Sequence, residues 1–321
     1  MKRLLLILTL LAGLWPRAAA RPDSTRVKQL QQLRMHVASG QYSGITQVEE
    51  GVYAVVHDKS AGGGLHFFTL NFRRSGRIAS ALSFETDAGG PTGRDNEDVV
   101  FVPETRTLFV AAEGEQRIRE YDLSGRPTGR ELAVPEALKQ CRSNAGFEAL
   151  AYRDGRFWTT TEAPLPGEAQ HRLQCFSLDG LQPLEQYGYR CDEPLISAED
   201  SRSARAHAWG VSAMTALEDG RLAVLEREIY VPGGSLLNAL RGAFSLTRIY
   251  LVDPLHDGSP LLQKTLLTEF RTSARNLANF EGMCLGPRLE DGRQVLLLIA
   301  DSQDGAGGLT KEYLRVILYT P

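Results

Sequence analysis

Hydrophobic and polar residues alternate in a unit that recurs five times along the chain. Each unit is a short apolar strand, a polar turn that usually contains Gly, and a second apolar strand that ends on an acid. The five copies read SGITQVEEGVYAVVHD from Ser43, NEDVVFVPETRTLFVAAE from Asn96, FEALAYRDGRFWTTTE from Phe147, VSAMTALEDGRLAVLE from Val211 and FEGMCLGPRLEDGRQVLLLIAD from Phe280. Asp-Gly pairs at 154–155, 219–220 and 291–292 are typical of hairpin turns.

Further strands follow each predicted hairpin. Third strands begin at Leu65, Arg117, His171, Thr247 and Tyr313, and fourth strands are visible at 78–84 and 261–267. With Ser43, Glu97, Glu148, Ser212 and Glu281 taken as equivalent, the repeat intervals are 54, 51, 64 and 69 residues. Four short strands in a unit of this size predict an all-β protein, a β-propeller with five four-stranded blades. Six blades are the alternative.

The two ends of the chain are expected to share one blade. The fifth unit ends after its third strand, and the segment 26–33 precedes the first unit. We expect this segment to add the missing outer strand and close the ring. The helical crossovers that a two-domain α/β fold needs are absent from the pattern. The insertion 231–242, in the fourth unit, is expected to form a short helix or a loop over one face.

Composition narrows the class of protein. The 321 residues carry a formal net charge of −3, with 42% hydrophobic and 23% charged residues. These values are ordinary for a globular protein and exclude a disordered tail protein or a polytopic membrane protein. No basic stripe is present, so we expect no nucleic-acid partner. We expect a monomer that binds a small-molecule substrate.

Residues 1–20 have the layout of a secretory signal peptide. Lys2 and Arg3 precede an apolar run from Leu4 to Trp15, and the small residues 18–20 follow. The run is too short to span a bilayer comfortably. We therefore expect an exported protein, periplasmic or secreted, with one domain at 21–321 and no membrane attachment after signal removal. The alternative is an N-terminal anchor that stays uncleaved.

The cysteines are compatible with export. Cys141, Cys175 and Cys191 lie within about fifty residues, and Cys284 lies in an apolar strand-like run. We expect one disulfide bond among the first three and a buried thiol at Cys284. No CxxC pair and no Cys/His zinc spacing occurs.

Acidic residues recur at two places in the repeat. The first strands begin at Ser43, Glu97, Glu148, Ser212 and Glu281. The second strands end at His57 with Asp58, Glu113, Glu162, Glu226 and Asp301. In a propeller blade these two places lie on the same face, because the second strand runs back beside the first. The repeat therefore predicts an inner group of carboxylates near the axis and a second group just outside it.

Converging carboxylates repel one another and raise each other's pKa unless a cation lies between them. Hard oxygen ligands suit Ca²⁺, with Mg²⁺ and Mn²⁺ as alternatives, and scarce His and Cys argue against zinc. The expected metal ligands are Glu97, Glu148, Glu281, Asp301, Glu226 and Asp58. The loop 301–308 could add ligands through Asp304. The alternative is that these acids solvate a channel mouth or pair with Lys and Arg.

Several segments resemble a known family. GRDNEDVVF, NAGFEALAY with TTTEAP, and NFEGMCLG with IADSQD are similar to the family named "esterase-like activity of phytase", or phytase-like. The resemblance covers roughly residues 40–320. It implies an exported protein that hydrolyses phosphate esters. The family's acidic positions map onto Glu97, Glu113, Glu148, Glu162, Glu281 and Asp301, whereas Ser43 and Ser212 depart from the pattern.

A metal-dependent phosphoesterase is the first function hypothesis. Glu162, Glu113 and His57 are the candidate catalytic residues, because a free carboxylate or imidazole can accept the proton of an attacking water. Lys59, Arg94, Arg227 and Lys311 are candidates for binding the substrate phosphate, or alternatively for pairing with the acids. The other hypotheses are a lactonase or carboxylesterase on the same scaffold, and a non-catalytic, calcium-stabilised binding propeller.

Overall fold

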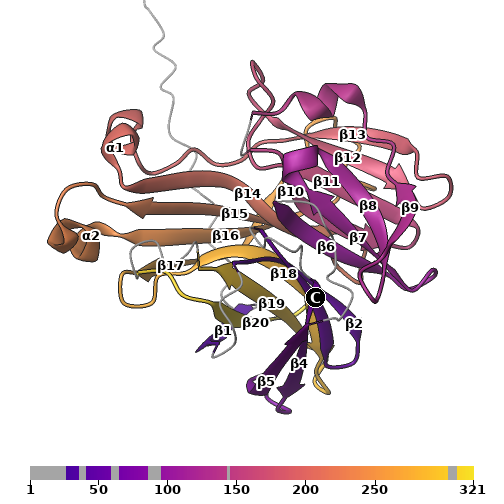
Figure 1. Cartoon of the computed structure of the whole chain (residues 1–321), viewed down its shortest axis with the longest axis horizontal. Coiled ribbons are helices and arrows are strands. Elements are labelled where there is room, and N and C mark those ends of the chain that lie inside the picture. The colour runs from indigo at the N-terminus through magenta and orange to yellow at the C-terminus, as the bar shows by residue number, and fades with distance from the viewer. Residues whose placement is uncertain (1–26, 36–40, 59–64, 86–94, 143–144, 303–308) are drawn as a thin grey trace, which may run out of the picture.

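The strands assemble into five antiparallel sheets of four strands each, arranged around a common axis as a five-bladed β-propeller (Figure 1). The computed structural model describes residues 27–35, 41–58, 65–85, 95–142, 145–302 and 309–321. Within these ranges the predicted all-β fold and the number of blades are confirmed. The expected signal peptide, Lys59, Arg94 and Asp304 lie outside the described residues.

Consecutive strands of the sequence form four of the blades. The first contains β2 (Tyr42–Glu49), β3 (Val52–His57), β4 (Leu65–Phe72) and β5 (Ile78–Glu85). The second contains β6 (Asn96–Val102), β7 (Thr107–Ala112), β8 (Arg117–Asp122) and β9 (Pro127–Glu131). The third contains β10 (Phe147–Arg153), β11 (Arg156–Thr161), β12 (His171–Ser177) and β13 (Pro183–Tyr189). The fourth contains β14 (Ala206–Ala216), β15 (Leu222–Val231), β16 (Phe244–Val252) and β17 (Thr265–Ser273).

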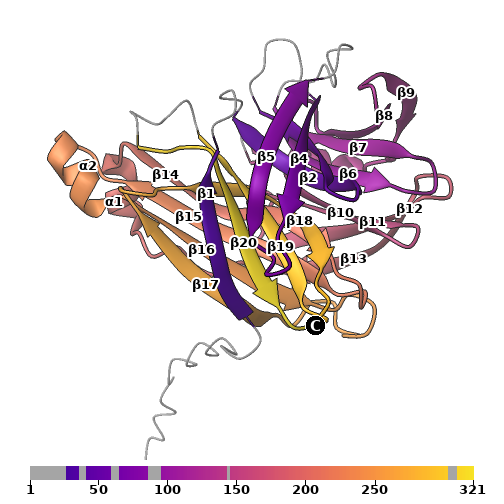
Figure 2. The same ribbon diagram turned by 90° about the horizontal axis from the view of Figure 1, so that it is seen from below.

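The fifth blade joins the two ends of the described chain. It contains β18 (Asn279–Arg288), β19 (Gln294–Asp301), β20 (Tyr313–Tyr319) and β1 (Val27–Arg34). Antiparallel pairing of β1 with β20 runs from Val27 opposite Tyr319 to Arg34 opposite Tyr313. Figure 2 shows β1 lying along the outer side of β20. The predicted closure of the ring by an N-terminal strand is thus confirmed.

Burial explains why the inner strands read as apolar runs. Every residue of β19 is buried, because this strand lies between neighbouring blades, whereas every residue of the outermost strand β9 is exposed. Five apolar clusters each join two adjacent blades, and one of them places Val55 of the first blade with Leu297 of the fifth. The inner strands also approach closely. A Cβ atom at Gly282 would lie 2.2 Å from the carbonyl oxygen of Ser43, so no larger residue fits there.

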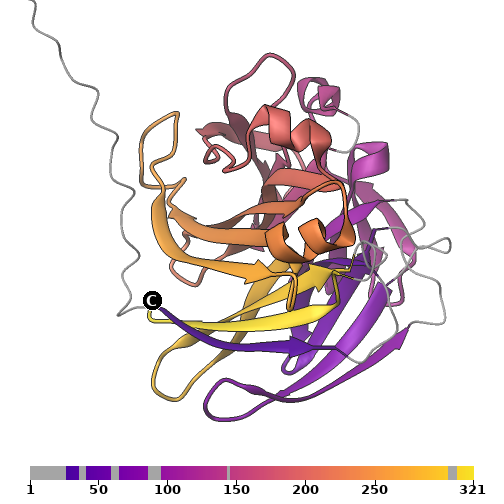
Figure 3. The same ribbon diagram turned by 90° about the vertical axis from the view of Figure 1, so that its left-hand side faces the viewer.

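The fourth blade extends beyond the others. Its first two strands, β14 and β15, have 11 and 10 residues, against 7 and 6 for β10 and β11. Helix α1 (Ala198–Ser203) and helix α2 (Leu236–Gly242) lie at its outer end (Figure 3). The helix expected within 231–242 is therefore confirmed as α2. Two short 3-10 helices, η1 (Glu113–Glu115) and η2 (Glu136–Gln140), precede β8 and β10.

The expected disulfide bond is wrong. All four cysteines are free thiols in the structure: Cys175 and Cys284 are buried and Cys141 and Cys191 are partly buried. Cys175 packs in the core between the third and fourth blades, and Cys141 packs against the core between the second and third. Closeness along the sequence therefore did not bring these thiols into bonding position. Among the described residues, no helix is long and apolar enough to cross a membrane.

Candidate metal centre

A β-bulge marks the same place in the inner hairpin of every blade. The pairing register shifts between Tyr42 and Ile45, Asn96 and Asp98, Phe147 and Ala149, Val211 and Ala213, and Phe280 and Gly282. The extra residues include Ser43, Glu97, Glu148, Ser212 and Glu281, which we call the inner positions. A bulge breaks the alternation of side chains and re-aims one of them. The predicted start-of-strand residues are therefore the ones that the bulges single out.

In each blade, the residue two positions before the inner position faces a residue on the second-strand side of the hairpin, which we call the outer position. These outer positions are Asp58 opposite Gln41, Glu113 opposite Asp95, Glu162 opposite Gly146, Arg227 opposite Gly210 and Asp301 opposite Asn279. Four of the five were expected. In the fourth blade the structure corrects the sequence alignment by one residue, from Glu226 to Arg227, because the interval from the inner to the outer position varies among the blades.

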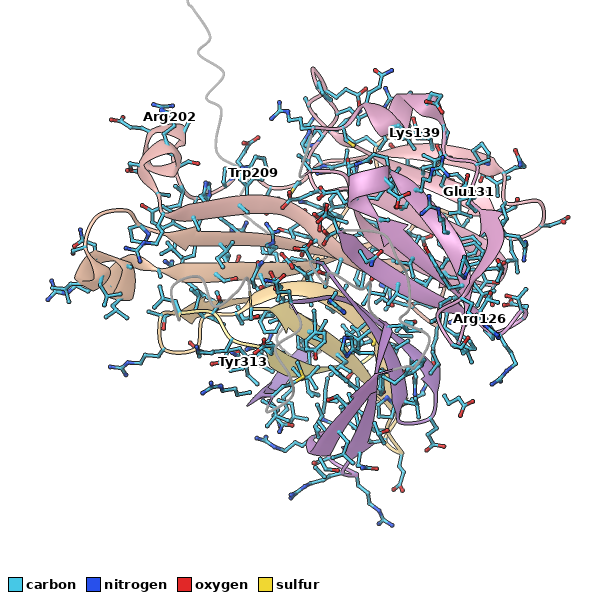
Figure 4. All side chains as sticks on the ribbon, viewed as in Figure 1. Arg126, Glu131, Lys139, Arg202, Trp209 and Tyr313 are labelled. Carbon is cyan, nitrogen blue, oxygen red and sulfur yellow. The ribbon has the colours of Figure 1, made fainter. Side chains whose placement is uncertain are left out.

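Three buried carboxylates converge at the hub on the second and third blades. One carboxylate oxygen each of Glu97, Glu113 and Glu148 lies within 4.8 Å of the other two. Glu113 accepts a hydrogen bond of 2.7 Å from the amide of Gly146. Glu97 and Glu148 receive no hydrogen bond from the residues that the structure describes. Oxygen-bearing side chains gather where the inner strands converge near the centre of Figure 4.

The electrostatics of this group favour a bound cation. Burial raises the pKa of Glu97 well above its ordinary range, and the charges of Asp58, Glu281, Glu113 and Asp301 raise it further. Burial and the charge of Glu97 also raise the pKa of Glu148, and they outweigh the charge of Arg227, which lowers it. Buried carboxylates without donors are either protonated or held by a cation. Because all the available ligands are carboxylate oxygens, the residues fit Ca²⁺, Mg²⁺ or Mn²⁺ rather than zinc.

Arg227 provides the positive charge on the other side of the hub. Its Nη2 lies 2.8 Å from Oε1 of Glu162 and 3.2 Å from Oε1 of Glu281. Asn279 donates a further hydrogen bond of 2.5 Å to Glu281. Burial alone would lower the pKa of Arg227, but the nearby glutamates outweigh it and raise that pKa. The sequence offered two roles for Arg227, binding the substrate phosphate or pairing with the acids, and in the structure it pairs with the acids.

Glu226, expected among the metal ligands, takes part in a different network. Its carboxylate accepts hydrogen bonds from Tyr189 Oη at 2.5 Å, from the amide of Asp192 at 3.0 Å and from Lys264 Nζ at 2.6 Å. Lys264 also lies 2.7 Å from Asp192. The side chains of adjacent strand residues point to opposite faces. Because Arg227 points to the hub, Glu226 points to the junction between the third and fourth blades.

Two further predicted site residues are His57 and Lys311. The imidazole of His57 packs against His66 and Tyr42, with ring centroids 4.7 Å and 6.5 Å apart, in the first blade. Burial, with a contribution from His66, lowers the pKa of His57 to about 4. Lys311 is partly buried just before β20, and no ion pair joins it to another described residue.

Asp98 is a buried acid that the sequence analysis missed. Its Oδ1 accepts a 2.8 Å hydrogen bond from the amide of Val99, and its Oδ2 accepts one of 2.7 Å from the amide of Leu150 on β10. The bond to Leu150 ties the bulge of Glu97 to the strand that carries Glu148. The sequence does contain a signal for Asp98, because it is a charged residue directly after an inner position. The residues that follow the other inner positions are small, namely Gly44, Ala149, Ala213 and Gly282.

The sequence matches a known protein family. The family model described as "Phytase-like: Esterase-like activity of phytase" matches residues 37–303. No curated protein matches the chain. Among solved structures, the catalytic domain of a GH62 α-L-arabinofuranosidase from Coprinopsis cinerea has a TM-score of 0.47 at 12% identity, covering 93% of this chain and 98% of that one. An α-L-arabinofuranosidase from Podospora anserina has a TM-score of 0.46 at 11% identity, covering 91% and 94%.

Proposed function

This chain belongs to the phytase-like family, described as esterase-like activity of phytase, and we propose that it is an exported, calcium-dependent phosphoesterase-like hydrolase. The proposed metal ligands are Glu97, Glu113 and Glu148. The single observation that carries the proposal is the convergence of these three buried carboxylates within 4.8 Å. The layout of residues 1–20 supports export.

The residues around the three ligands have separate roles in the proposal. Gly146 holds Glu113 in place through its amide, and Asp98 holds the strands of Glu97 and Glu148 together. A bound calcium ion would supply the positive charge that polarises a phosphate ester and its attacking water. Glu162 has one oxygen on Arg227, and its second oxygen is proposed to accept the proton of the attacking water. Lys59, Arg94 and Lys311 are proposed to contact the substrate phosphate.

Turnover of phosphate esters with and without calcium tests the proposed function. The purified protein is incubated with p-nitrophenyl phosphate and with phytate, in Ca²⁺ and in excess chelator. We expect hydrolysis that calcium restores and that Glu148→Gln abolishes. Glu290→Gln is the matched control, because Glu290 is an exposed acid, 84% accessible at its side chain, that should leave the rate unchanged.

The same assay separates the alternatives. Turnover of lactones or aryl esters without turnover of phosphates would replace the proposed function by a lactonase or carboxylesterase. A rise in melting temperature on adding calcium, with no turnover of any of these substrates, would leave a calcium-stabilised binding propeller. If calcium changes neither rate nor melting temperature, the metal centre itself is wrong.

A further inference from the structure

The fourth blade breaks the charge pattern that the other blades share. At the outer position, Asp58, Glu113, Glu162 and Asp301 are acids, and Arg227 is the exception. The inner position of the same blade holds Ser212, which donates a hydrogen bond of 3.0 Å to the carbonyl oxygen of Phe280 instead of adding a charge. The fourth blade is therefore the one that contributes a cation, and no acid, to the ring of ten positions.

Arg227 is placed to neutralise the acids of both neighbouring blades. Glu162 belongs to the third blade and Glu281 to the fifth, and Nη2 of Arg227 contacts both. Gly210, which pairs with Arg227, allows this approach. A Cβ atom there would lie 2.2 Å from the carbonyl oxygen of Glu162, so the inner strand of the fourth blade lies directly against the end of β11.

The guanidinium divides the hub into two halves. Glu162 and Glu281 contact the guanidinium directly, whereas Glu97, Glu113 and Glu148 form no ion pair with another described residue. The charge of Arg227 acts on Glu148 only through space, where it lowers the pKa of that carboxyl group. A metal ion bound between Glu162 and Glu281 would lie beside a side chain that is 4% exposed, where repulsion between like charges is poorly screened. Arg227 therefore acts most strongly against a cation between Glu162 and Glu281, the two acids that it contacts.

The Arg227 guanidinium is only partly paired. Nε and Nη1 of Arg227 are buried and have no hydrogen-bond partner among the described residues. A cavity of about 10 Å³, lined in part by Trp209, Glu228 and Cys191, lies on the other face of β15. Trp209 lies on the extended part of β14 (Figure 4).

We propose that Arg227 is a built-in counter-ion that restricts the hub to one divalent cation, and that removing its charge opens a second cation site between Glu162 and Glu281. The inference rests on the metal centre of the proposed function. It makes Arg227 a determinant of metal stoichiometry rather than a group that binds substrate. It also makes Glu281 a partner of Arg227, so this acid is not a ligand of the first cation.

Equilibrium dialysis of the metal-free protein against radioactive calcium measures the number of bound ions. We expect one tight ion per chain in the wild type, two in Arg227→Ala and one in Arg227→Lys, the matched control that keeps the charge. Glu148→Gln should bind none, and Arg227→Ala with Glu148→Gln should bind one. A count of one in folded Arg227→Ala, or of two in the wild type, overturns the proposal.

A second measurement applies if Arg227→Ala does not fold. Glu281→Gln in the wild-type background should still bind one calcium ion, because Arg227 already occupies that acid, and loss of the ion would overturn the proposal. The dialysis is independent of catalysis. If the wild type binds one ion but hydrolyses no substrate, the proposed hydrolase is wrong and the role of Arg227 is unaffected. If the wild type hydrolyses substrate and Arg227→Ala still binds only one ion, the role of Arg227 is wrong and the proposed hydrolase is unaffected. A wild type that binds no calcium removes both.

Discussion

Asp98 on the second blade accepts a 2.7 Å hydrogen bond from the amide of Leu150 on the third. This bond crosses the blade boundary next to Glu97 and Glu148, the two hub carboxylates that lack a donor among the described residues. It joins the strands whose bulges carry the proposed metal ligands. A buried acid thus holds the ligand geometry without itself being a ligand.

Asp98→Ala should weaken both the fold and the metal centre. The substitution leaves the buried amides of Val99 and Leu150 without acceptors, and each unsatisfied group costs about 1–3 kcal/mol. We expect the free energy of unfolding to fall by about 2–6 kcal/mol in urea denaturation. Asp98→Asn keeps one acceptor oxygen and should lose about half as much. Equal losses in the two variants would contradict the assigned bonds.

The stability of the metal-free protein should rise as the pH falls from neutral toward the ordinary carboxyl pKa of 4.5. The folded-state pKa values of Glu97 and Glu148 are raised, so the folded state binds more protons than the unfolded state, and their contribution is lost as pH rises through the folded values. Calorimetry with excess chelator measures this trend, and saturating calcium should suppress it. A double Gln variant of the two residues is the control. If that variant keeps the wild-type pH profile, the trend has another origin.

Glu226→Gln should leave calcium affinity within about threefold of the wild type, because Glu226 lies in the network of Lys264 and Asp192. Lys264→Met removes the cation that this network shares and should destabilise the fold by about 3–5 kcal/mol, since it leaves Glu226 buried without its charged partner. Calcium titration and urea denaturation measure the two effects. Loss of calcium binding in Glu226→Gln would restore Glu226 to the ligand set.

Removal of β1 should destabilise the whole ring rather than one edge. A variant that begins at residue 36 exposes the edge of β20 and lacks Leu30 and Leu33, which pack on the core between the fifth and first blades. We expect a lower melting temperature and a broader transition, and addition of a peptide with the sequence of residues 26–35 should restore part of the loss. An unchanged melting temperature would show that closure by β1 contributes little to stability.

Local patterning predicted most of the fold. The hairpins at residues 147–162 and 211–226 are predicted because apolar strands flank Asp-Gly turns, and the closing strand is predicted because the fifth repeat lacks one. The fourth strand of the fourth blade begins at Thr265, later than the expected start at Leu261. Leu261 forms only an isolated bridge with Gly188 of the third blade, a contact that no local signal indicates.

The amino-acid sequence by itself determined the repeat, the five blades and the acids at equivalent positions, because these follow from strand periodicity and spacing. The tertiary structure alone decided which of those acids meet. The hairpin intervals vary, so the register that turns Arg227 to the hub and Glu226 away from it is settled only when each strand pairs with its neighbours. The ion pairs of Arg227 with Glu162 and Glu281 depend on the closure of the ring, since residues this far apart become neighbours only when the blades surround a common axis.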